Sequence, residues 1–307
     1  MLIVRRGELI AAGYEPDEIR QRLRSGELVK VRPGAYVGDA LPRAPEQRHR
    51  LTVRAAVPDL AAETVISHVS AAVMWNVPTW GIALDRVHGT RPRRSGARRG
   101  RAVHLHAAPL EPHEVAVVDG IAVTSPARTV VDIARSVPFE QAVVLADRAL
   151  HSGLVHADDL AAALASAAHR PGSPAARRAL HFADGRSESV GESRSRTAIA
   201  AAGLPVPVLQ WDVRTQAGTW LGRADFGWPE RGAVGEFDGR IKYSRELHPH
   251  VEAGDVVFAE KRREDALRDA GLRVVRWIWS DLDDFTSTAD RLRRALGIPT
   301  SGARTPR

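Results

Sequence analysis

Two short strand-like runs joined by a tight turn constrain the fold of this chain more than any other stretch. The runs cover residues 224–228 and 233–237, and Pro229 and Gly232 lie at the turn between them. Proline and glycine between two such runs are typical of a β-hairpin. We therefore expect two adjacent strands in the C-terminal third of the chain.

Three carboxylates occupy this hairpin. Asp225 lies inside the first run, and Glu236 and Asp238 end the second. Because side chains alternate along a strand, Glu236 and Asp238 are expected on one face. Their mutual repulsion would be relieved by a divalent cation, and hard oxygen ligands suit Mg²⁺ or Mn²⁺. The alternative is a set of solvated carboxylates at strand ends that bind nothing.

This segment resembles the PD-(D/E)XK nuclease superfamily, in particular a branch similar to very-short-patch repair endonucleases that is common in actinobacteria. Asp225 and Glu236 match the motif by position. The resemblance implies that they bind the metal ion and activate water. The motif's proline is replaced by Ala224 and its lysine by Asp238, although Glu-x-Asp-Gly is usual in this branch.

The same resemblance extends to both sides of the hairpin. It implies an entry helix whose glutamate reaches the metal site, which favours Glu192 over Glu188. A helix over residues 257–270 and a strand over 272–277 follow. The candidate catalytic residues are Asp225, Glu236, Asp238, Lys242, Lys261 and Glu192, with Asp225, Glu236 and Asp238 as metal ligands.

The N-terminal 40 residues predict two helices and a hairpin. Pro16 opens a helix that stops at Gly26, and Pro33-Gly34 forms the turn between two strands. Helix and basic hairpin together predict a winged helix-turn-helix, in which the helix enters the major groove. The alternative is a small domain that binds nothing.

The N-terminal and middle regions resemble AbiEi-type antitoxins. The matching segments are Arg24-Ser25-Gly26-Glu27-Leu28, Arg32-Pro33-Gly34-Ala35-Tyr36, residues 67–72 and residues 124–129. The resemblance implies DNA binding at the N-terminus, a cognate toxin protein and a middle domain that serves as scaffold. His68 has no partners at catalytic or metal-ligand spacing in the sequence, so we interpret it as structural.

An arginine-rich stretch interrupts the middle region. Seven arginines and no acid occur between Arg86 and Arg101, and a flexible loop of this kind suits phosphate contacts. A solvated loop in a chain with biased codon usage is the alternative, because only three of the 44 basic residues are lysines. The candidate DNA-binding residues are Arg20, Arg22, Arg24, Lys30, Arg32, Arg93, Arg94, Arg98 and Arg99.

Composition narrows the class of protein. The net charge of +7 and the pI near 10.5 favour nucleic acid as a partner. The absence of cysteine excludes disulfides and thiolate metal sites and fits a reducing cytoplasm. No apolar run is long enough to cross a bilayer, so we expect no membrane partner.

Taken together, the sequence predicts an α/β (mixed α+β) multidomain protein. The expected parts are a winged helix over 1–40, a middle domain over 41–170, a linker over 171–186, a nuclease-like domain over 187–299 and a disordered tail over 300–307. The expected function is metal-dependent DNA endonuclease. The alternatives are a non-cutting DNA-binding regulator and a protein-binding adaptor, and a homodimer is an expected assembly.

Overall fold

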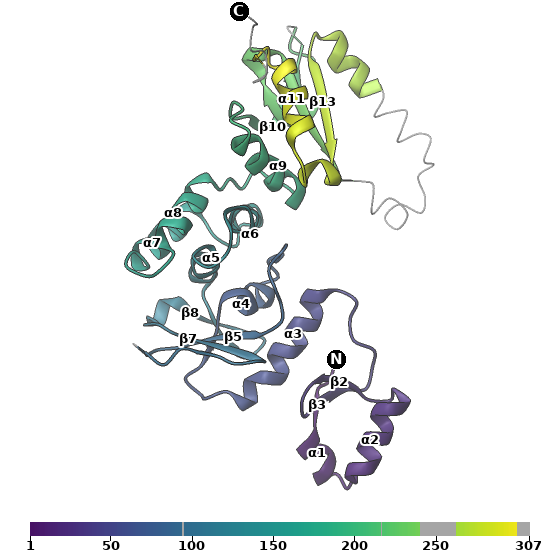
Figure 1. Ribbon diagram of the computed structural model, residues 1–307, viewed down its shortest axis with the longest axis vertical. Coiled ribbons are helices and arrows are strands. Elements are labelled where there is room, and N and C mark those ends of the chain that lie inside the picture. The colour runs from purple at the N-terminus through teal and green to yellow at the C-terminus, as the bar shows by residue number, and fades with distance from the viewer. Residues whose placement is uncertain (94, 216, 240–261, 300–307) are drawn as a thin grey trace, which may run out of the picture. The chain divides into compact units, whose positions relative to one another are not determined.

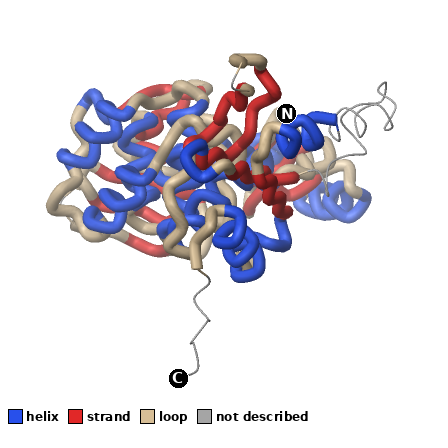
Figure 2. The backbone as a smooth tube through the Cα atoms, turned by 90° about the horizontal axis from the view of Figure 1, so that it is seen from above, coloured by secondary structure: helices blue, strands red, loops and turns tan. Residues whose placement is uncertain are grey.

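The computed structural model describes residues 1–93, 95–215, 217–239 and 262–299. The chain divides into two compact units, Met1–Ala183 and Asp184–Arg307. Both units contain helices and strands, and this confirms the mixed α/β class. Figure 2 shows the helices in blue and the strands in red. The division lies within the predicted linker over 171–186, and the predicted tail lies outside the described residues.

The first 40 residues form two helices and a three-stranded antiparallel sheet of order β1-β3-β2. Pro16 occupies the first turn of α2, and Gly26 ends it in the left-handed conformation with φ of 83°. Leu9, Ile19 and Tyr36 form the small core. The elements are β1 Val4–Arg5, α1 Arg6–Ala11, α2 Pro16–Ser25, β2 Val29–Arg32 and β3 Ala35–Val37.

Two arginines join this N-terminal part to the rest of the first unit. Arg5 Nη2 lies 2.7 Å and Arg32 Nη1 lies 2.9 Å from the carboxylate of Asp59. Both guanidinium groups also donate to the carbonyl of Ala55 in the last turn of helix α3. Residues 1–40 therefore belong to the same compact unit as the middle region.

A six-stranded mixed sheet of order β6-β7-β5-β4-β9-β8 forms the centre of the first unit. Strand β5 is parallel to β7, and β4 is parallel to β9. Helices α3 and α4 contribute to the core that covers the sheet (Figure 1). The elements are α3 Pro45–Ala56, β4 Val65–Ile66, α4 His68–Met74, β5 Val87–Arg91, β6 Arg98–Arg99, β7 Val103–Ala107, β8 Val115–Val118 and β9 Ile121–Thr124.

Four further helices complete the first unit and share two apolar clusters. Their centre is α5, whose Arg128 is 1% exposed and is held by carboxylates. Its Nε lies 2.7 Å from Asp132 Oδ2 and its Nη1 lies 2.9 Å from Glu114 Oε2. The helices are α5 Pro126–Ala134, α6 Phe139–His151, α7 Ala157–Ser166 and α8 Ser173–Phe182.

The second unit contains a four-stranded sheet of order β10-β11-β12-β13. The first three strands are antiparallel, and β13 is parallel to β12. The predicted hairpin is confirmed as β11 and β12, whose turn ends at Gly232 with φ of 56°. The elements are α9 Val190–Ala201, β10 Val208–Arg214, β11 Trp220–Trp228, β12 Ala233–Asp238, a helix described over 262–269, β13 Arg273–Ile278 and α11 Thr286–Ala295.

Large aromatic side chains fill the core of this unit. Phe226 and Trp277 are fully buried and stack with ring centroids 5.2 Å apart. Trp277 Nε1 donates a hydrogen bond of 2.7 Å to Ser195 Oγ, which satisfies the buried indole and ties β13 to α9. No helix among the described residues is long and apolar enough to cross a membrane.

Candidate functional site

Three carboxylates from three elements meet beside the hairpin of the second unit. Asp225 belongs to β11, Glu236 to β12 and Glu192 to the first turn of α9. Phe226 pairs with Gly235, so Asp225 and Glu236 are the next positions along the two antiparallel strands. Like charges at such positions destabilise a sheet unless another charge offsets them.

The pKa of Asp225 is affected by the nearby carboxylates. The pKa of its carboxyl is raised to about 6, mainly by burial and also by the charges of Glu192 and Glu236. The backbone amide of Phe237, which donates to Asp225 Oδ2 over 2.8 Å, and the charge of Arg263 act in the opposite direction. Strongly raised carboxyl pKa values of this kind are common at functional sites.

Two guanidinium groups hold the carboxylate of Glu236, which is 7% exposed. Arg276 Nε donates to Oε2 over 2.9 Å, and Arg263 Nη2 contacts Oε1. Arg276 is also the Cα partner of Glu236 across the parallel pair β12–β13. Both oxygens of Glu236 are therefore engaged by cations.

Glu192 is fixed by hydrogen bonds from its own helix start and from the sheet. Its Oε1 accepts from Ser189 Oγ at 2.8 Å, and Ser189 Oγ in turn accepts from the Glu192 amide at 3.1 Å. Its Oε2 accepts from the Glu188 amide at 2.9 Å and from Gln210 Nε2 at 2.8 Å. Ser189 thus caps the helix, and Glu192 is held at the helix start while it contributes charge beside Asp225.

A glycine allows α9 to approach β12 at this point. A Cβ on Gly191 would lie 1.9 Å from the ring of Phe237, far inside contact distance. Gln210 is a second irregular position, because its φ is 51° within strand β10. Non-glycine residues with positive φ are strained and often occur at functional sites.

Of the remaining predicted catalytic residues, Asp238 is the one that the structure describes. Asp238 ends β12 opposite Ile278, and the largest carboxylate contributions to the pKa of Asp225 come from Glu192 and Glu236. Lys242 and Lys261 lie outside the described residues. In the described ranges, the group of three ligand atoms within 4.8 Å is formed by histidines of the first unit and not by these acids. Occupancy by Mg²⁺ or Mn²⁺ stays a prediction.

Sequence reasoning missed Gln210, Arg263 and Arg276. Arg276 could have been found from the sequence, because it lies in a strand-like run that follows a basic helix. Gln210 could not have been found in this way, because its position depends on the irregular backbone of β10. The two arginines change the electrostatics of the site from purely acidic to mixed.

The candidate DNA-binding residues of α2 differ in their contacts. Arg20 contacts Asp17, and Arg22 lies 3.3 Å from Glu18 with its guanidinium 4.6 Å from the Tyr14 ring centroid. Arg24 is exposed. On the hairpin, Lys30 is exposed as well, whereas Arg32 is engaged with Asp59.

The arginine-rich stretch includes a short edge strand rather than only a loop. Arg98 and Arg99 form β6, pair with β7 and have exposed side chains. Arg93 forms an ion pair of 2.6 Å with Glu63. Arg94 lies outside the described residues.

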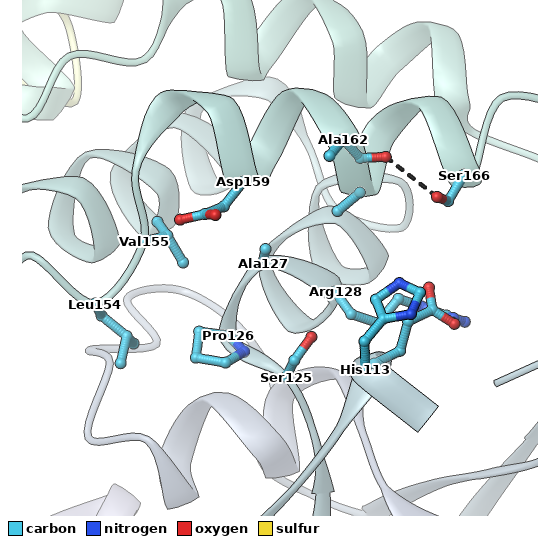
Figure 3. Close-up of a pocket in the computed structure, with 12 residues that line it drawn as sticks. His113, Ser125, Pro126, Ala127, Arg128, Leu154, Val155, Asp159, Ala162 and Ser166 are labelled. Atoms are coloured by element: carbon cyan, nitrogen blue, oxygen red, sulfur yellow. Dashed lines mark hydrogen bonds and ion pairs between the residues drawn. The ribbon is translucent and has the colours of Figure 1, made fainter. Parts of the chain in front are cut away.

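A cavity of about 370 Å³ lies between the start of α5 and helix α7 (Figure 3). Its polar groups are engaged locally: Ser166 Oγ donates to the Ala162 carbonyl at 3.2 Å, and Asp159 Oδ2 accepts from the His156 amide at 2.9 Å. The segment 124–129 beside it is held by the Thr124–Thr129 hydroxyl contact of 2.6 Å and by the ion pairs of Arg128. These contacts give the segment a structural role.

Comparisons with known proteins identify relatives without assigned activity. No protein-family model matches the chain. Two curated proteins of Mycobacterium tuberculosis, uncharacterized protein MT2308 (strain CDC 1551 / Oshkosh) and uncharacterized protein Rv2248 (strain ATCC 25618 / H37Rv), are each 34% identical over 166 residues, which cover 54% of this chain and 58% of theirs. The match thus spans little more than half the length of these curated relatives.

One solved structure, that of the RV2827C protein from Mycobacterium tuberculosis, is remotely similar. The alignment covers 68% of this chain and 78% of that chain, with 19% identity and a TM-score of 0.40.

Proposed function

We propose that this chain is a DNA-binding protein whose second unit hydrolyses DNA phosphodiester bonds with the aid of Mg²⁺ or Mn²⁺. The observation that carries the proposal is the buried carboxyl of Asp225, with a pKa of about 6, beside Glu236 and Glu192. Burying carboxylates together is costly unless a cation compensates them. Acidic residues on two adjacent strands are also what the resemblance to PD-(D/E)XK nucleases implies.

Each residue of the cluster has a role in this reaction. Asp225 and Glu236 would hold the metal ion, which lowers the pKa of bound water and offsets charge on the scissile phosphate. Glu192, fixed by Ser189 and Gln210, would orient the attacking water by accepting a hydrogen bond. Arg263 and Arg276 lie beside Glu236, where their N–H groups can bind phosphate oxygens. Lys242 and Lys261 remain candidates for the same electrostatic role.

Exposed basic residues of the first unit support DNA binding. Arg24 on α2, Lys30 on the hairpin and the edge strand Arg98–Arg99 present cations to solvent. Such groups bind the phosphate backbone of DNA without sequence preference, and they make the DNA-binding affinity strongly dependent on salt concentration. Arg32 is assigned a structural role instead, because it is tied to Asp59.

One observation favours a second candidate, a DNA-binding regulator that does not cut. Both carboxylate oxygens of Glu236 are already compensated by Arg263 and Arg276, and Asp238 occupies the position of the motif's lysine. A site stabilised in this way does not require a metal ion. In this case the partner would be an operator DNA and, by the antitoxin resemblance, a cognate toxin.

A cleavage assay separates the two candidates. Purified full-length protein is incubated with supercoiled and mismatched linear DNA in Mg²⁺, Mn²⁺ or EDTA. Asp225→Asn and Glu236→Gln are the test variants, and Glu230→Gln, an exposed acid in the turn of the same hairpin, is the matched control. Metal-dependent nicking by wild type and Glu230→Gln, with none by the test variants, would support the nuclease.

Absence of cutting by well-folded wild type on both substrates would overturn the nuclease proposal. The regulator would then be tested by electrophoretic mobility shift at several salt concentrations. We expect the Arg24→Ala, Lys30→Ala double variant to bind more weakly and to show a salt slope reduced by about 2, because two phosphate contacts are lost. An unchanged affinity and slope would exclude these two residues from the DNA interface.

A further inference from the structure

Four histidines gather at one face of the six-stranded sheet in the first unit. His88 lies on β5, His104 and His106 lie on the neighbouring strand β7, and His68 opens α4. The parallel register pairs His88 with His104 and Thr90 with His106. Because residues two apart on a strand share a face, the register itself brings these imidazoles together.

The rings are in direct contact. His88 Nδ1 lies 3.1 Å from His106 Nε2, and the His68 ring stacks on His106 with centroids 3.6 Å apart. The ring of His104 also stacks on that of His106, with the two centroids 4.0 Å apart. One nitrogen from each of His68, His88 and His106 lies within 4.8 Å of the other two. A tetrahedral site with zinc–nitrogen bonds of about 2.0–2.1 Å places ligand nitrogens about 3.4 Å apart, and the 3.1 Å between His88 Nδ1 and His106 Nε2 is close to this separation.

A second layer of contacts orients His68. Its Nδ1 lies 3.0 Å from Ser67 Oγ, which also accepts a hydrogen bond of 2.8 Å from the fully buried Thr90. This contact leaves Nε2 as the nitrogen available to the cluster, and ligating histidines are commonly oriented in this way. His68 also has φ of 51°, a strained value for a histidine that directs its side chain.

A cavity of about 370 Å³ opens beside the rings. His68, His88, His104 and His106 line it, together with Arg86 and Arg99. A metal ion held by three histidines would keep one coordination position toward this cavity. The two guanidinium groups favour an anion, such as hydroxide or phosphate, at that position.

We propose that His68, His88 and His106 form a binding site for Zn²⁺, with the fourth coordination position open to the cavity. Three imidazole ligands and an open position are the donor set that zinc takes in sites which bind a further small ligand. This site belongs to the first unit and is independent of the acidic cluster in the second. It also assigns a ligand role to His68, which the sequence analysis interpreted as structural.

Zinc retention by the full-length protein, prepared without an affinity tag, tests the site. Protein is stripped with EDTA, loaded with Zn²⁺ in excess Mg²⁺, passed over a desalting column and assayed for metal. We expect about one Zn²⁺ per chain for wild type, because three pre-oriented ligands bind tightly. The test variant is His88→Asn with His106→Asn, and the matched control is His169→Asn, an exposed histidine outside the cluster.

The variants decide where the metal ion binds. The double variant should retain no Zn²⁺, whereas His169→Asn and the Asp225→Asn, Glu236→Gln double variant should retain it as wild type does. Thr90→Val, which removes the hydroxyl that supports Ser67, should weaken binding by about 10-fold. Retention by the His88→Asn, His106→Asn variant, or no retention by wild type, would overturn the proposal.

A spectroscopic measurement on wild type does not depend on the folding of any variant. Co²⁺ in place of Zn²⁺ should give the intense visible d–d absorption of a tetrahedral nitrogen-ligated ion, and added phosphate should shift it. The weak absorption of hexa-aqua Co²⁺ would contradict the site.

Discussion

The backbone amide of Phe237 donates a hydrogen bond of 2.8 Å to Asp225 Oδ2 and so joins the two strands of the hairpin at the acidic cluster. The bond favours the ionised carboxylate, yet burial and the charges of Glu192 and Glu236 outweigh it and raise the pKa of Asp225 to about 6. The site therefore holds a carboxyl group whose ionisation is costly in the folded protein. A bound cation would reverse that cost.

The stability of the second unit should depend on pH through the ionisation of the Asp225 carboxyl group. In the unfolded chain Asp225 ionises near 3.8, and in the folded protein it ionises near 6. The folded state is therefore favoured below pH 4, and this advantage is lost as pH rises from about 4 to about 6. At about 1.4 kcal/mol per pKa unit, the full effect is about 3 kcal/mol.

Replacing Asp225 by Asn should remove this effect, because the amide oxygen can still accept from Phe237 and carries no charge. We expect Asp225→Asn to be more stable than wild type by about 3 kcal/mol at pH 7.5 and nearly equal to it at pH 4. Urea unfolding followed by tryptophan fluorescence measures the difference. Asp212→Asn, an exposed aspartate on β10, is the control and should show no such change. Equal stability of Asp225→Asn and wild type at both pH values would contradict the raised pKa.

Gly191 should be intolerant of any side chain. A methyl group there would meet the ring of Phe237 at 1.9 Å, so α9 or β12 must shift. We expect Gly191→Ala to lower the free energy of unfolding by about 1–3 kcal/mol and to displace Glu192 from the cluster. Adding Phe237→Leu to Gly191→Ala should recover part of the loss, which a double-mutant cycle would measure. Purely additive losses would show that the two residues do not meet.

Arg128 should be essential to the stability of the first unit. Its replacement by Leu leaves Asp132 and Glu114 buried with fewer partners, at 1% and 5% exposure. Breaking a buried ion pair from one side costs about 3–5 kcal/mol. Arg93→Leu, which removes the exposed pair with Glu63, should cost no more than about 1 kcal/mol. Hydrogen exchange of the amides in α5 and α6 would report the difference.

The histidine cluster should make the first unit labile to acid in the absence of metal. Histidines of the unfolded chain take up protons near pH 6.5, whereas folded His88 and His106 do so near 4 and 2. The folded state is therefore fully favoured above pH 6.5 and is progressively disfavoured as pH falls through this range. At pH 5 the loss is about 2 kcal/mol for each histidine.

The His88→Asn, His106→Asn variant should accordingly lose less stability than wild type between pH 7.5 and pH 5, with EDTA present in both samples. Hydrogen exchange of the amides in β5 and β7 is the measurement. His169→Asn serves again as the control and should follow wild type. A variant as acid-sensitive as wild type would place the origin of the lability outside the cluster.

Local sequence signals were sufficient to predict many individual helices, strands and turns. Pro16 and Gly26 delimit α2, and Pro229 and Gly232 define the turn between β11 and β12, because proline and glycine restrict the backbone wherever they stand. The positions of Asp225 and Glu236 on adjacent strands followed from that turn. The mixed α/β class followed from the alternation of these signals along the chain.

The contacts that give each site its chemistry depend on pairings between distant segments. Arg276 meets Glu236 through the parallel register of β12 and β13, and His88 meets His106 through the register of β5 and β7. A single strand carries no information about which strand lies beside it or in which register. The sequence by itself therefore determined where strands, turns and candidate ligands occur, and only the tertiary structure decided that arginines compensate Glu236 and that histidines separated by up to 38 residues form one cluster.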